Sequence, residues 1–479
     1  MSSSRFDGRT RRDQKATQSR GVYRSSLVAL ALVLGVLAAA WFLADDVDGQ
    51  RVVGRYSERR LLILIGASYV MCWTAYLVTG RAALRTKIVH AALSTFSALL
   101  AVALVELPAV AGWIDYRRLL SPPESVIFTR LKPWERPSSR FDPELLFVHR
   151  PGLRFTGRTP GDLVDWLRIR TDRQYDVDLQ YDEHGFRNRL TLTRADVVAI
   201  GDSFVEAGLV PDRDLLTSRL AAAFGVEIAN LGQGGYGPQQ ELIVLRRYGK
   251  PLRPRLVLWF VFEGNDLGDV HRYEQFRRDL QVRRTASLVD RLFTVSALRT
   301  LQWVVAPDAT RDSTEARRRS CRFDARAEDT ALVDPLNLYF AYAGAELTED
   351  DLRALDVLQR SVQMAATEVR SEGAAFLLLF VPTKYRVHAG VCTPPADGYL
   401  SEWRINDLPA RLGAWAQSAG VDYLDLTGPL RAAAERGLLT YFPDDGHWNS
   451  AGHRVVAASI ETRLRRRGSL NGAADRAAR

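Results

Sequence analysis

The chain has 479 residues, of which 47% are hydrophobic and 25% charged, and its formal net charge is +9. The excess positive charge lies at the two ends: residues 1–24 carry a net charge of +5, residues 461–479 carry +4, and the remainder sums to zero. Because the body of the chain has no net basic charge, we expect no nucleic-acid partner. The length exceeds that of one ordinary domain.

Three segments near the N-terminus are candidate membrane spans. Residues 25–44 and 61–79 contain no charged side chain, and residues 88–112 contain only Glu106 and His90 as ionisable groups. About 20 apolar residues in a helix cross the roughly 30 Å of a bilayer core. A cleavable signal peptide is the alternative for the first segment, and three buried core helices are the alternative for all of them. We therefore predict a basic cytoplasmic tail over 1–24 and a three-span anchor over 25–112, with Glu106 near the outer interface and in reach of water.

The basic residues that flank these segments predict their orientation. The tail is strongly basic, and the loop 80–87 has three basic residues and no acid, whereas the loop 45–60 has four arginines and four acids. The excess of basic residues favours the tail and the loop 80–87 on the cytoplasmic side. The chain after residue 112 is then expected on the extracytoplasmic side of the cell membrane.

Cysteine and histidine usage bounds the possible cofactors. Cys72 lies in the second candidate span, and Cys321 and Cys392 lie in the part expected outside, where a disulfide could form or both thiols could stay free. The seven histidines show no metal-ligand spacing, so we expect no metal or other cofactor.

The external part divides into several predicted segments. Residues 113–195 contain proline pairs and short alternating stretches, which predict a small β-rich lead-in. From residue 196 strands alternate with helices, with strands expected at 197–200, 226–229, 256–262, 375–381 and 421–426 and helices at 215–224, 238–248, 348–372, 402–419 and 449–466. This alternation predicts an α/β fold, a parallel-sheet α/β/α sandwich of flavodoxin-like type, over 196–466. Residues 268–346 interrupt it as an insertion, either a lid or acceptor-binding element or a surface excursion, and 467–479 is expected to be a flexible tail.

A candidate nucleophile follows the first strand of this predicted sheet, and a candidate base precedes the last helix. Ser203, in Gly201-Asp202-Ser203, comes directly after the first strand, and His447 lies in Asp444-Asp-Gly-His-Trp448 before the last helix. A serine, a histidine and a carboxylate that orients the histidine are the groups needed for acyl transfer through a serine ester. We predict Asp444 as the orienting carboxylate and expect Asp445 to point elsewhere.

Other roles remain open for residues near this motif. Ser203 could instead cap a helix, Asp202 is expected to accept backbone hydrogen bonds, and His453 is expected to be a surface or packing residue. 

Two further motifs could stabilise an oxyanion. Gly235 lies in a glycine-rich turn after the second strand and could donate its backbone N–H, and Asn265 follows the third strand and could donate its side-chain amide. A tight turn and a helix cap are the alternative interpretations. The glycine-rich stretch lacks the Gly-Lys-Ser/Thr ending of a phosphate-binding loop.

Taken together, these four blocks resemble those of the SGNH (GDSL-type) hydrolase family, in the order the family has them. The resemblance covers about 196–466 and implies Ser203 as nucleophile, His447 as base with Asp444 as its partner, and an oxyanion hole made by the Ser203 amide, Gly235 and Asn265. The chain also resembles the alginate-acetylation SGNH-like proteins in its expected location. In those proteins the Asp-His motif precedes the serine, whereas here it follows, so the sequence does not assign the chain to them.

The resulting hypothesis is a membrane-anchored serine esterase or acyl transfer enzyme that acts outside the cytoplasmic membrane on O-acyl groups of a cell-surface glycan or lipid. One alternative is an O-acetyltransferase that works with a separate membrane protein as acyl donor, because we expect three spans to be too few to carry the donor across the bilayer. The other is a non-catalytic, anchored glycan-binding module.

Overall fold

The computed structural model describes residues 51–468 except 54–55, 80–81, 115, 117–119, 121–137, 168, 170, 283–290, 306–312 and 326–335. The chain forms two compact units, one made of residues 1–123 and 285–310 and the other of residues 124–284 and 311–479. The first candidate span, at 25–44, the basic tail and the C-terminal residues 469–479 lie outside the described residues.

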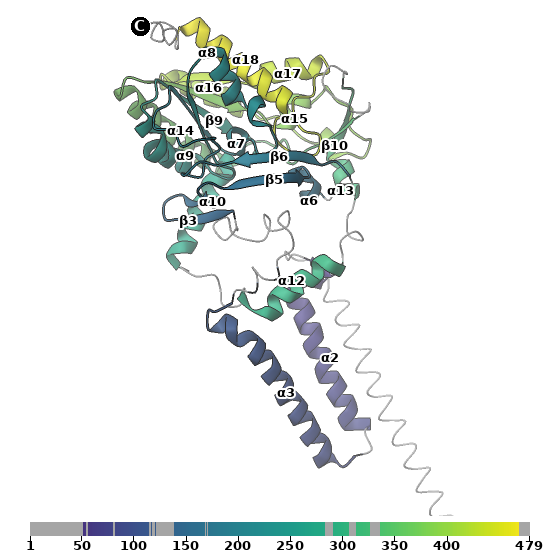
Figure 1. Cartoon of the computed structure of the whole chain (residues 1–479). Coiled ribbons are helices and arrows are strands. Elements are labelled where there is room, and N and C mark those ends of the chain that lie inside the picture. The colour runs from purple at the N-terminus through teal and green to yellow at the C-terminus, as the bar shows by residue number, and fades with distance from the viewer. Residues whose placement is uncertain are drawn as a thin grey trace, which may run out of the picture. The chain divides into compact units, whose positions relative to one another are not determined.

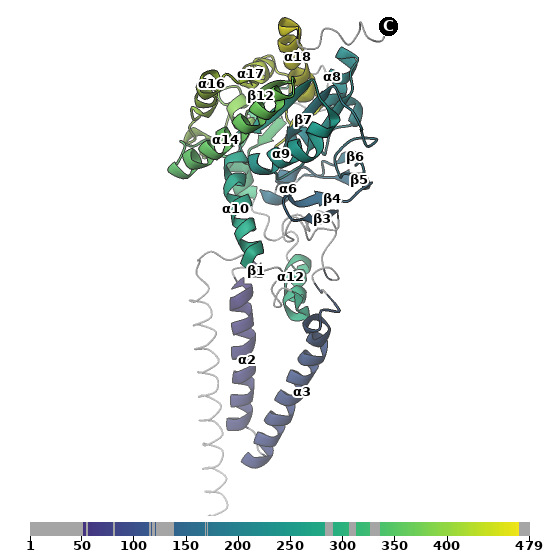
Figure 2. The ribbon, with the colours of Figure 1, turned by 90° about the vertical axis from the view of Figure 1, so that its left-hand side faces the viewer.

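The described residues of the first unit form two long helices and one shorter helix. Its described elements are β1 (Arg51–Val53), β2 (Tyr56–Ser57), α2 (Glu58–Thr79), α3 (Leu84–Val110) and α12 (Phe293–Val305). Helices α2 and α3 lie side by side (Figure 2), joined by a hydrogen bond of 2.7 Å from Lys87 Nζ to the Leu77 carbonyl. Among the residues that the structure describes, α3 is the one helix long and apolar enough to cross a membrane.

Glu106 differs from its expected exposure to water. Its side chain is buried, and its carboxylate accepts hydrogen bonds from the backbone N–H groups of Phe293 and Thr294 at 2.6 and 2.8 Å. These donors belong to the first turn of α12, whose N–H groups have no partner within the helix. Glu106 therefore caps α12, a helix that comes from the predicted insertion 268–346.

The second unit is built on a five-stranded sheet in which every pairing is parallel. Its strands are β7 (Val197–Gly201), β8 (Ile228–Gly232), β9 (Leu256–Phe262), β12 (Ala375–Val381) and β13 (Asp422–Asp425). The spatial order is β13-β12-β9-β7-β8, with β9 and β12 in register from Leu256 opposite Ala375 to Phe262 opposite Val381. The chain leaves β7 toward β8 and then returns to the other side of β7 with β9. Ligands of open α/β sheets bind where the strand order reverses in this way.

Helices cover both faces of the sheet, as the continuous apolar strands predict. The helices of this unit are α6 (Asp162–Trp166), α7 (Ser203–Glu206), α8 (Leu216–Phe224), α9 (Pro238–Val244), α10 (Asp266–Val282), α13 (Ser313–Arg318), α14 (Glu349–Ser371), α15 (Lys384–His388), α16 (Leu408–Ser418), α17 (Thr427–Glu435) and α18 (Ser450–Arg467). Alternate strand residues point to opposite faces, so Val198 and Ile200 pack with α9, α14 and α16 while Val197 and Ala199 pack with α8, α17 and α18. Figure 1 shows α9 and α14 on one side of the sheet and α8 and α18 on the other.

The α/β sandwich predicted from sequence is thus confirmed, with small shifts at the ends of elements. The helix expected from residue 402 begins at Leu408, because Pro409 occupies its first turn, where a missing N–H costs nothing. The helix expected over 238–248 ends at Val244 and continues as one π turn to Gly249.

The described part of the lead-in contains four strands. It forms two antiparallel hairpins, β3 (Ser139–Asp142) with β4 (Leu146–His149) and β5 (Arg154–Thr159) with β6 (Tyr175–Gln180). A further hairpin, β10 (Ser320–Phe323) with β11 (Leu336–Tyr339), comes from the predicted insertion. Cys321 of β10 is disulfide-bonded to Cys392, which answers the question that the sequence left open.

Candidate active site

The nucleophile candidate lies in a sharp turn at the end of β7. Asp202 caps the short helix α7 and accepts a hydrogen bond of 2.9 Å from the Phe204 N–H, so it is a backbone acceptor, as expected. Gly201 is required here by close packing, since a Cβ at this position would lie 2.7 Å from Val205 Cγ2. The turn leaves Ser203 as the first residue of α7, next to the point where the strand order reverses.

His447 lies between Ser203 and a carboxylate. Its Nε2 is 2.7 Å from Ser203 Oγ, and its Nδ1 is 2.7 Å from Asp445 Oδ1. With Nδ1–H donating to the carboxylate, Nε2 is free to accept the serine proton. Folding therefore brings together two side chains that are 244 positions apart in the chain.

The prediction that Asp444 orients His447 is wrong. The Asp444 carboxylate is fully buried, accepts a hydrogen bond from the Tyr175 hydroxyl and lies 3.7 Å from Arg173 Nη1, both in or beside β6 of the lead-in. Asp445 Oδ1 instead accepts from the backbone N–H of His447 at 2.8 Å as well as facing the ring. An aspartate commonly bonds the backbone two residues onward in this way, and the same turn brings its carboxylate to the ring of that residue.

A buried lysine holds the loop that carries these residues. Lys384 Nζ, at the start of α15, donates to the carbonyls of Phe442, Pro443 and Asp445 at 2.8, 3.0 and 2.8 Å. Burial lowers the pKa of Lys384 to about 8, although the carboxylates nearby act in the opposite direction. The ammonium group satisfies three carbonyls at once and fixes the backbone on which Asp445 and His447 depend.

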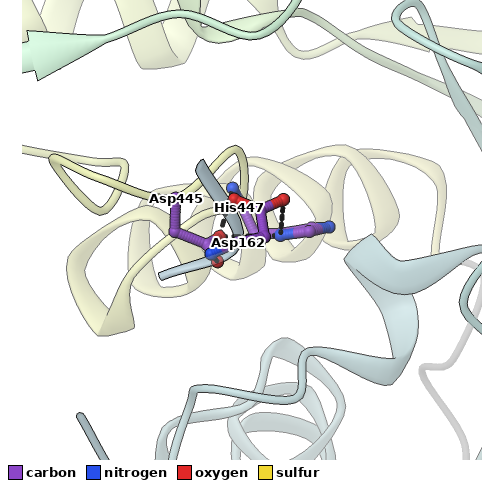
Figure 3. Close-up of side chains that lie close together, drawn as sticks. All are labelled: Asp162, Asp445 and His447. Atoms are coloured by element: carbon purple, nitrogen blue, oxygen red, sulfur yellow. Dashed lines mark hydrogen bonds and ion pairs between the residues drawn. The ribbon is translucent and has the colours of Figure 1, made fainter. Parts of the chain in front are cut away.

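Asp162 is a member of the site that the sequence analysis missed. It begins α6 in the lead-in, and its Oδ1 accepts from the Gly446 N–H at 2.9 Å while its own N–H donates to Asp445 Oδ2 at 2.9 Å. Its Oδ2 lies 3.8 Å from His447 Nδ1 (Figure 3). No motif marks Asp162, because it is 285 positions from His447 and only the packing of the lead-in brings it there.

The two carboxylates set the charge state of the histidine. Burial opposes the charged form of His447, but the negative charges of Asp445 and Asp162 outweigh it and raise its pKa to about 9. The side chain of Asp162 is 44% exposed, but its carboxylate lies among protein atoms that reduce its hydration, and this desolvation and the charge of Asp445 raise its pKa to about 7. Burial also acts to raise the pKa of Asp445, but His447 outweighs it and the pKa falls below its usual range. The site therefore stabilises the imidazolium that forms when the histidine accepts a proton.

Asp162, Asp445 and His447 are also the one group of described residues whose side-chain atoms lie close enough together to bind a metal ion. The atoms of Asp162, Asp445 and His447 lie within 4.8 Å of one another. His447 already bridges Ser203 and Asp445, so this arrangement fits acid–base chemistry without a metal ligand role.

The turns that carry the two predicted oxyanion donors lie beside the nucleophile turn. Gly235 has φ +80°, a conformation that favours glycine, and a Cβ on the preceding Gly234 would lie 3.5 Å from Ser203 Cβ. Asn265 precedes α10 and donates one side-chain N–H to Asp269 Oδ2 at 2.8 Å. Burial raises the pKa of Asp202, and both His447 and Asn265 oppose this shift, so Asn265 lies near the nucleophile turn.

A second buried carboxylate supports this glycine turn. Glu206, the last residue of α7, accepts from Gly234 N–H at 2.6 Å, from the Tyr181 hydroxyl at 2.5 Å and lies 2.9 Å from His149 Nε2. Burial acts to raise its pKa, but His149 and the other donors outweigh it and lower the pKa to about 2. His149 and Tyr181 come from the lead-in, which therefore contributes to both the histidine loop and the glycine turn. His453, by contrast, is a buried packing residue whose Nδ1 accepts from Leu216 N–H at 3.1 Å.

A parallel α/β sheet with a serine, a histidine and an aspartate in hydrogen-bonding sequence at its carboxyl edge defines a serine-dependent acyl hydrolase or acyltransferase. Residues 340–479 match the family described as SGNH hydrolase-like domain, acetyltransferase AlgX. The chain thus contains an SGNH-type domain and is an esterase or acyltransferase of that class. The motif order had argued against the alginate-acetylation proteins, and the match covers the part with His447 but not Ser203.

Comparison with other proteins adds little to this class assignment. No curated protein is significantly similar in sequence. Among solved structures, a GDSL-like lipase from Bacteroides thetaiotaomicron is 14% identical, with 57% of this chain and 88% of that chain covered and a TM-score of 0.27. A catalytic mutant of an acetylxylan esterase from Geobacillus stearothermophilus is 9% identical, with 58% and 96% covered and a TM-score of 0.30. At such low similarity the class rests on the site and on the family match.

Proposed function

We propose that this protein is a membrane-anchored serine enzyme that removes or transfers O-acyl groups of a glycan or lipid outside the cytoplasmic membrane. The contact of 2.7 Å between His447 Nε2 and Ser203 Oγ, with Asp445 on the other ring nitrogen, carries the proposal. It also argues against a non-catalytic glycan-binding module, which has no use for a nucleophile paired with a base.

In the proposed mechanism His447 takes the proton of Ser203 as Oγ attacks the acyl carbonyl carbon. The Ser203 and Gly235 N–H groups and the Asn265 amide stabilise the oxyanion, and the protonated His447 then gives its proton to the leaving alkoxide. The acyl group remains as an ester on Ser203. Water completes hydrolysis, or a sugar hydroxyl completes transfer, with His447 again removing the proton of the attacking oxygen.

The location outside the membrane is supported by two observations. The disulfide between Cys321 and Cys392 is typical of oxidising compartments, and α3 is long and apolar enough to cross a membrane. With the basic tail inside, the three predicted spans place the SGNH-type domain outside.

The test compares the full-length protein in detergent with its Ser203→Ala variant on p-nitrophenyl acetate. We expect the variant to lose on the order of 10⁴-fold or more in kcat, since removal of a serine nucleophile removes the acyl-enzyme route. Equal rates for the two proteins would reject the enzymatic function.

Acetyl transfer is the second candidate, favoured by the acetyltransferase description of the matching family. A transferase of this size would depend on a separate membrane protein for its activated acyl donor. Adding oligosaccharide acceptors to the p-nitrophenyl acetate reaction separates the two: acetylated oligosaccharide in the mass spectrum indicates transfer, and free acetate alone indicates hydrolysis.

A further inference from the structure

An exposed tryptophan lies beside the site without a role in the chemistry described so far. Trp166 ends α6 and is 55% exposed, although Leu163 of the same helix and Leu167, which follows the helix, are buried with Ala316 and Ala341. An indole that faces solvent does not contribute to folding the free energy that burial of its apolar surface would give. Its exposure beside an active site suggests that a ligand covers it.

A series of ring contacts connects Trp166 to the catalytic histidine. The Trp166 ring packs edge-to-face on Tyr342, with centroids 5.8 Å apart, and Tyr342 packs on Phe262 at 5.3 Å. Phe262 in turn contacts Phe204 at 4.3 Å, and Phe204 contacts the His447 ring at 4.9 Å. Trp166 is the outer end of this series.

Trp166 and Tyr342 lie close to the histidine loop and to the turn that carries Asn265. Asp162, which lies 3.8 Å from His447 Nδ1, begins the same helix one turn before Trp166, a rise of about 6 Å. Tyr342 lies against the backbone before Asn265, since a Cβ on Gly264 would be 2.9 Å from Tyr342 Cδ2. Burial raises the pKa of Tyr342, and the charges of Asp162 and Asp202 raise it further, which agrees with this position.

Two exposed charged side chains lie near Trp166 and Tyr342. Asp162 is 44% exposed, and Arg272, whose charge acts on Tyr342, is 51% exposed while paired to Asp269. A sugar ring presents an apolar C–H face that stacks on an aromatic ring and hydroxyl groups that bond to a carboxylate or guanidinium at its edge. An acyl chain offers no partner for those charged groups, which would lose hydration beside it.

We propose that Trp166 and Tyr342 form a subsite that binds a sugar ring of an O-acylated glycan next to Ser203. This inference rests on the proposed function and narrows its substrate from glycan or lipid to glycan. The ring stacks on Trp166 with its acyl group directed toward the serine.

The experiment measures kcat/KM of the full-length protein in detergent for acetylated cello-, xylo- and chito-oligosaccharides, p-nitrophenyl acetate and p-nitrophenyl octanoate. Trp166→Ala is expected to lower kcat/KM for the best acetylated oligosaccharide about tenfold, mostly through KM, with p-nitrophenyl acetate unchanged within about twofold. Trp166→Phe should recover part of the loss. Leu190→Ala, which also truncates an exposed apolar side chain at 76% exposure, is the matched control and should change nothing.

The proposal is overturned if Trp166→Ala lowers the rate equally for all substrates, lowers it most for the octanoate, or leaves the oligosaccharides unaffected. If the wild type shows no serine-dependent activity, the proposed function fails and the subsite is tested separately. In that case calorimetric titration with the unacetylated hexasaccharides decides: binding lost in Trp166→Ala supports the subsite, and no binding by the wild type rejects it.

Discussion

At the scale of single residues, the site depends on a histidine held between one hydroxyl and one carboxylate. Two adjacent aspartates compete for the second position, and the turn gives it to Asp445 because that residue also accepts the His447 backbone N–H. Asp444 is occupied by Tyr175 and Arg173 instead.

Neutralising each aspartate in turn tests this assignment. Asp445→Asn should lower kcat on p-nitrophenyl acetate by about 10⁴-fold, because an amide favours the wrong imidazole tautomer. Asp444→Asn should keep the catalytic geometry and lose far less, with any loss appearing in thermal stability. Steady-state kinetics and thermal unfolding of both variants measure this, and a larger kinetic loss in Asp444→Asn would restore the original sequence prediction.

Asp162 offers a test through pH. His447 must be neutral to act as a base, and its pKa is raised to about 9 by Asp445 and Asp162 against the effect of burial. The kcat/KM of the wild type should therefore rise with pH toward about 9. In Asp162→Asn, which can still accept from Gly446, loss of the negative charge should lower the pKa of His447 and move this rise to lower pH.

A pH–rate profile of the two proteins is the measurement, with Asp178→Asn as a control because Asp178 is an exposed acid of β6 paired with Arg154. An unchanged profile in Asp162→Asn would show that Asp162 has no electrostatic effect on the base.

The residues that sequence could predict are those that lie in short motifs. Ser203 follows a strand and His447 precedes the last helix, and the structure joins them. Asp162, Lys384 and Glu206 could not be found, because their roles arise from packing between segments that are distant in sequence. Sequence spacing alone does not distinguish Asp445 from Asp444, because the turn conformation decides which carboxylate faces the ring.

At the scale of elements, the lead-in is part of the site and not a separate appendage. Gly161 has no room for a side chain, since a Cβ would lie 2.2 Å from the Asp444 carbonyl oxygen, and the next residue contacts the histidine loop. The strand and helix pattern predicted the central sheet well, because apolar strands and capped helices are local signals. The docking of the hairpins had no such signal.

The disulfide ties the β10–β11 hairpin to the region after α15. It closes a loop of 71 residues, for which the chain-entropy argument gives about 4 kcal/mol of stability. A double Cys321→Ser, Cys392→Ser variant should unfold at clearly lower denaturant concentration than the wild type, and the reductant dithiothreitol should shift only the wild type. Identical unfolding curves for both proteins would show that the bridge does not form or does not stabilise the fold.

At the scale of the whole molecule, the chain combines an apolar N-terminal part with an SGNH-type domain, and the excess positive charge lies at the two ends of the chain. We predict that alkaline phosphatase fused after residue 479 is active in cells and that a green fluorescent protein fused there is dark, because the three predicted spans begin inside and end outside. Fluorescence of the second fusion together with inactivity of the first would reverse the predicted topology.

Candidate membrane spans and the asymmetry of charge can be read from the sequence. The capping of α12 by Glu106 cannot, because it joins residues 187 positions apart.

The central claim is that His447 activates Ser203 as a nucleophile, and covalent labelling tests it most directly. A fluorophosphonate probe should attach to Ser203 of the full-length protein, as located by mass spectrometry of its peptides, and the labelling rate should fall by several orders of magnitude in His447→Ala. Labelling at another residue, or equal labelling of Ser203 without His447, would contradict the account.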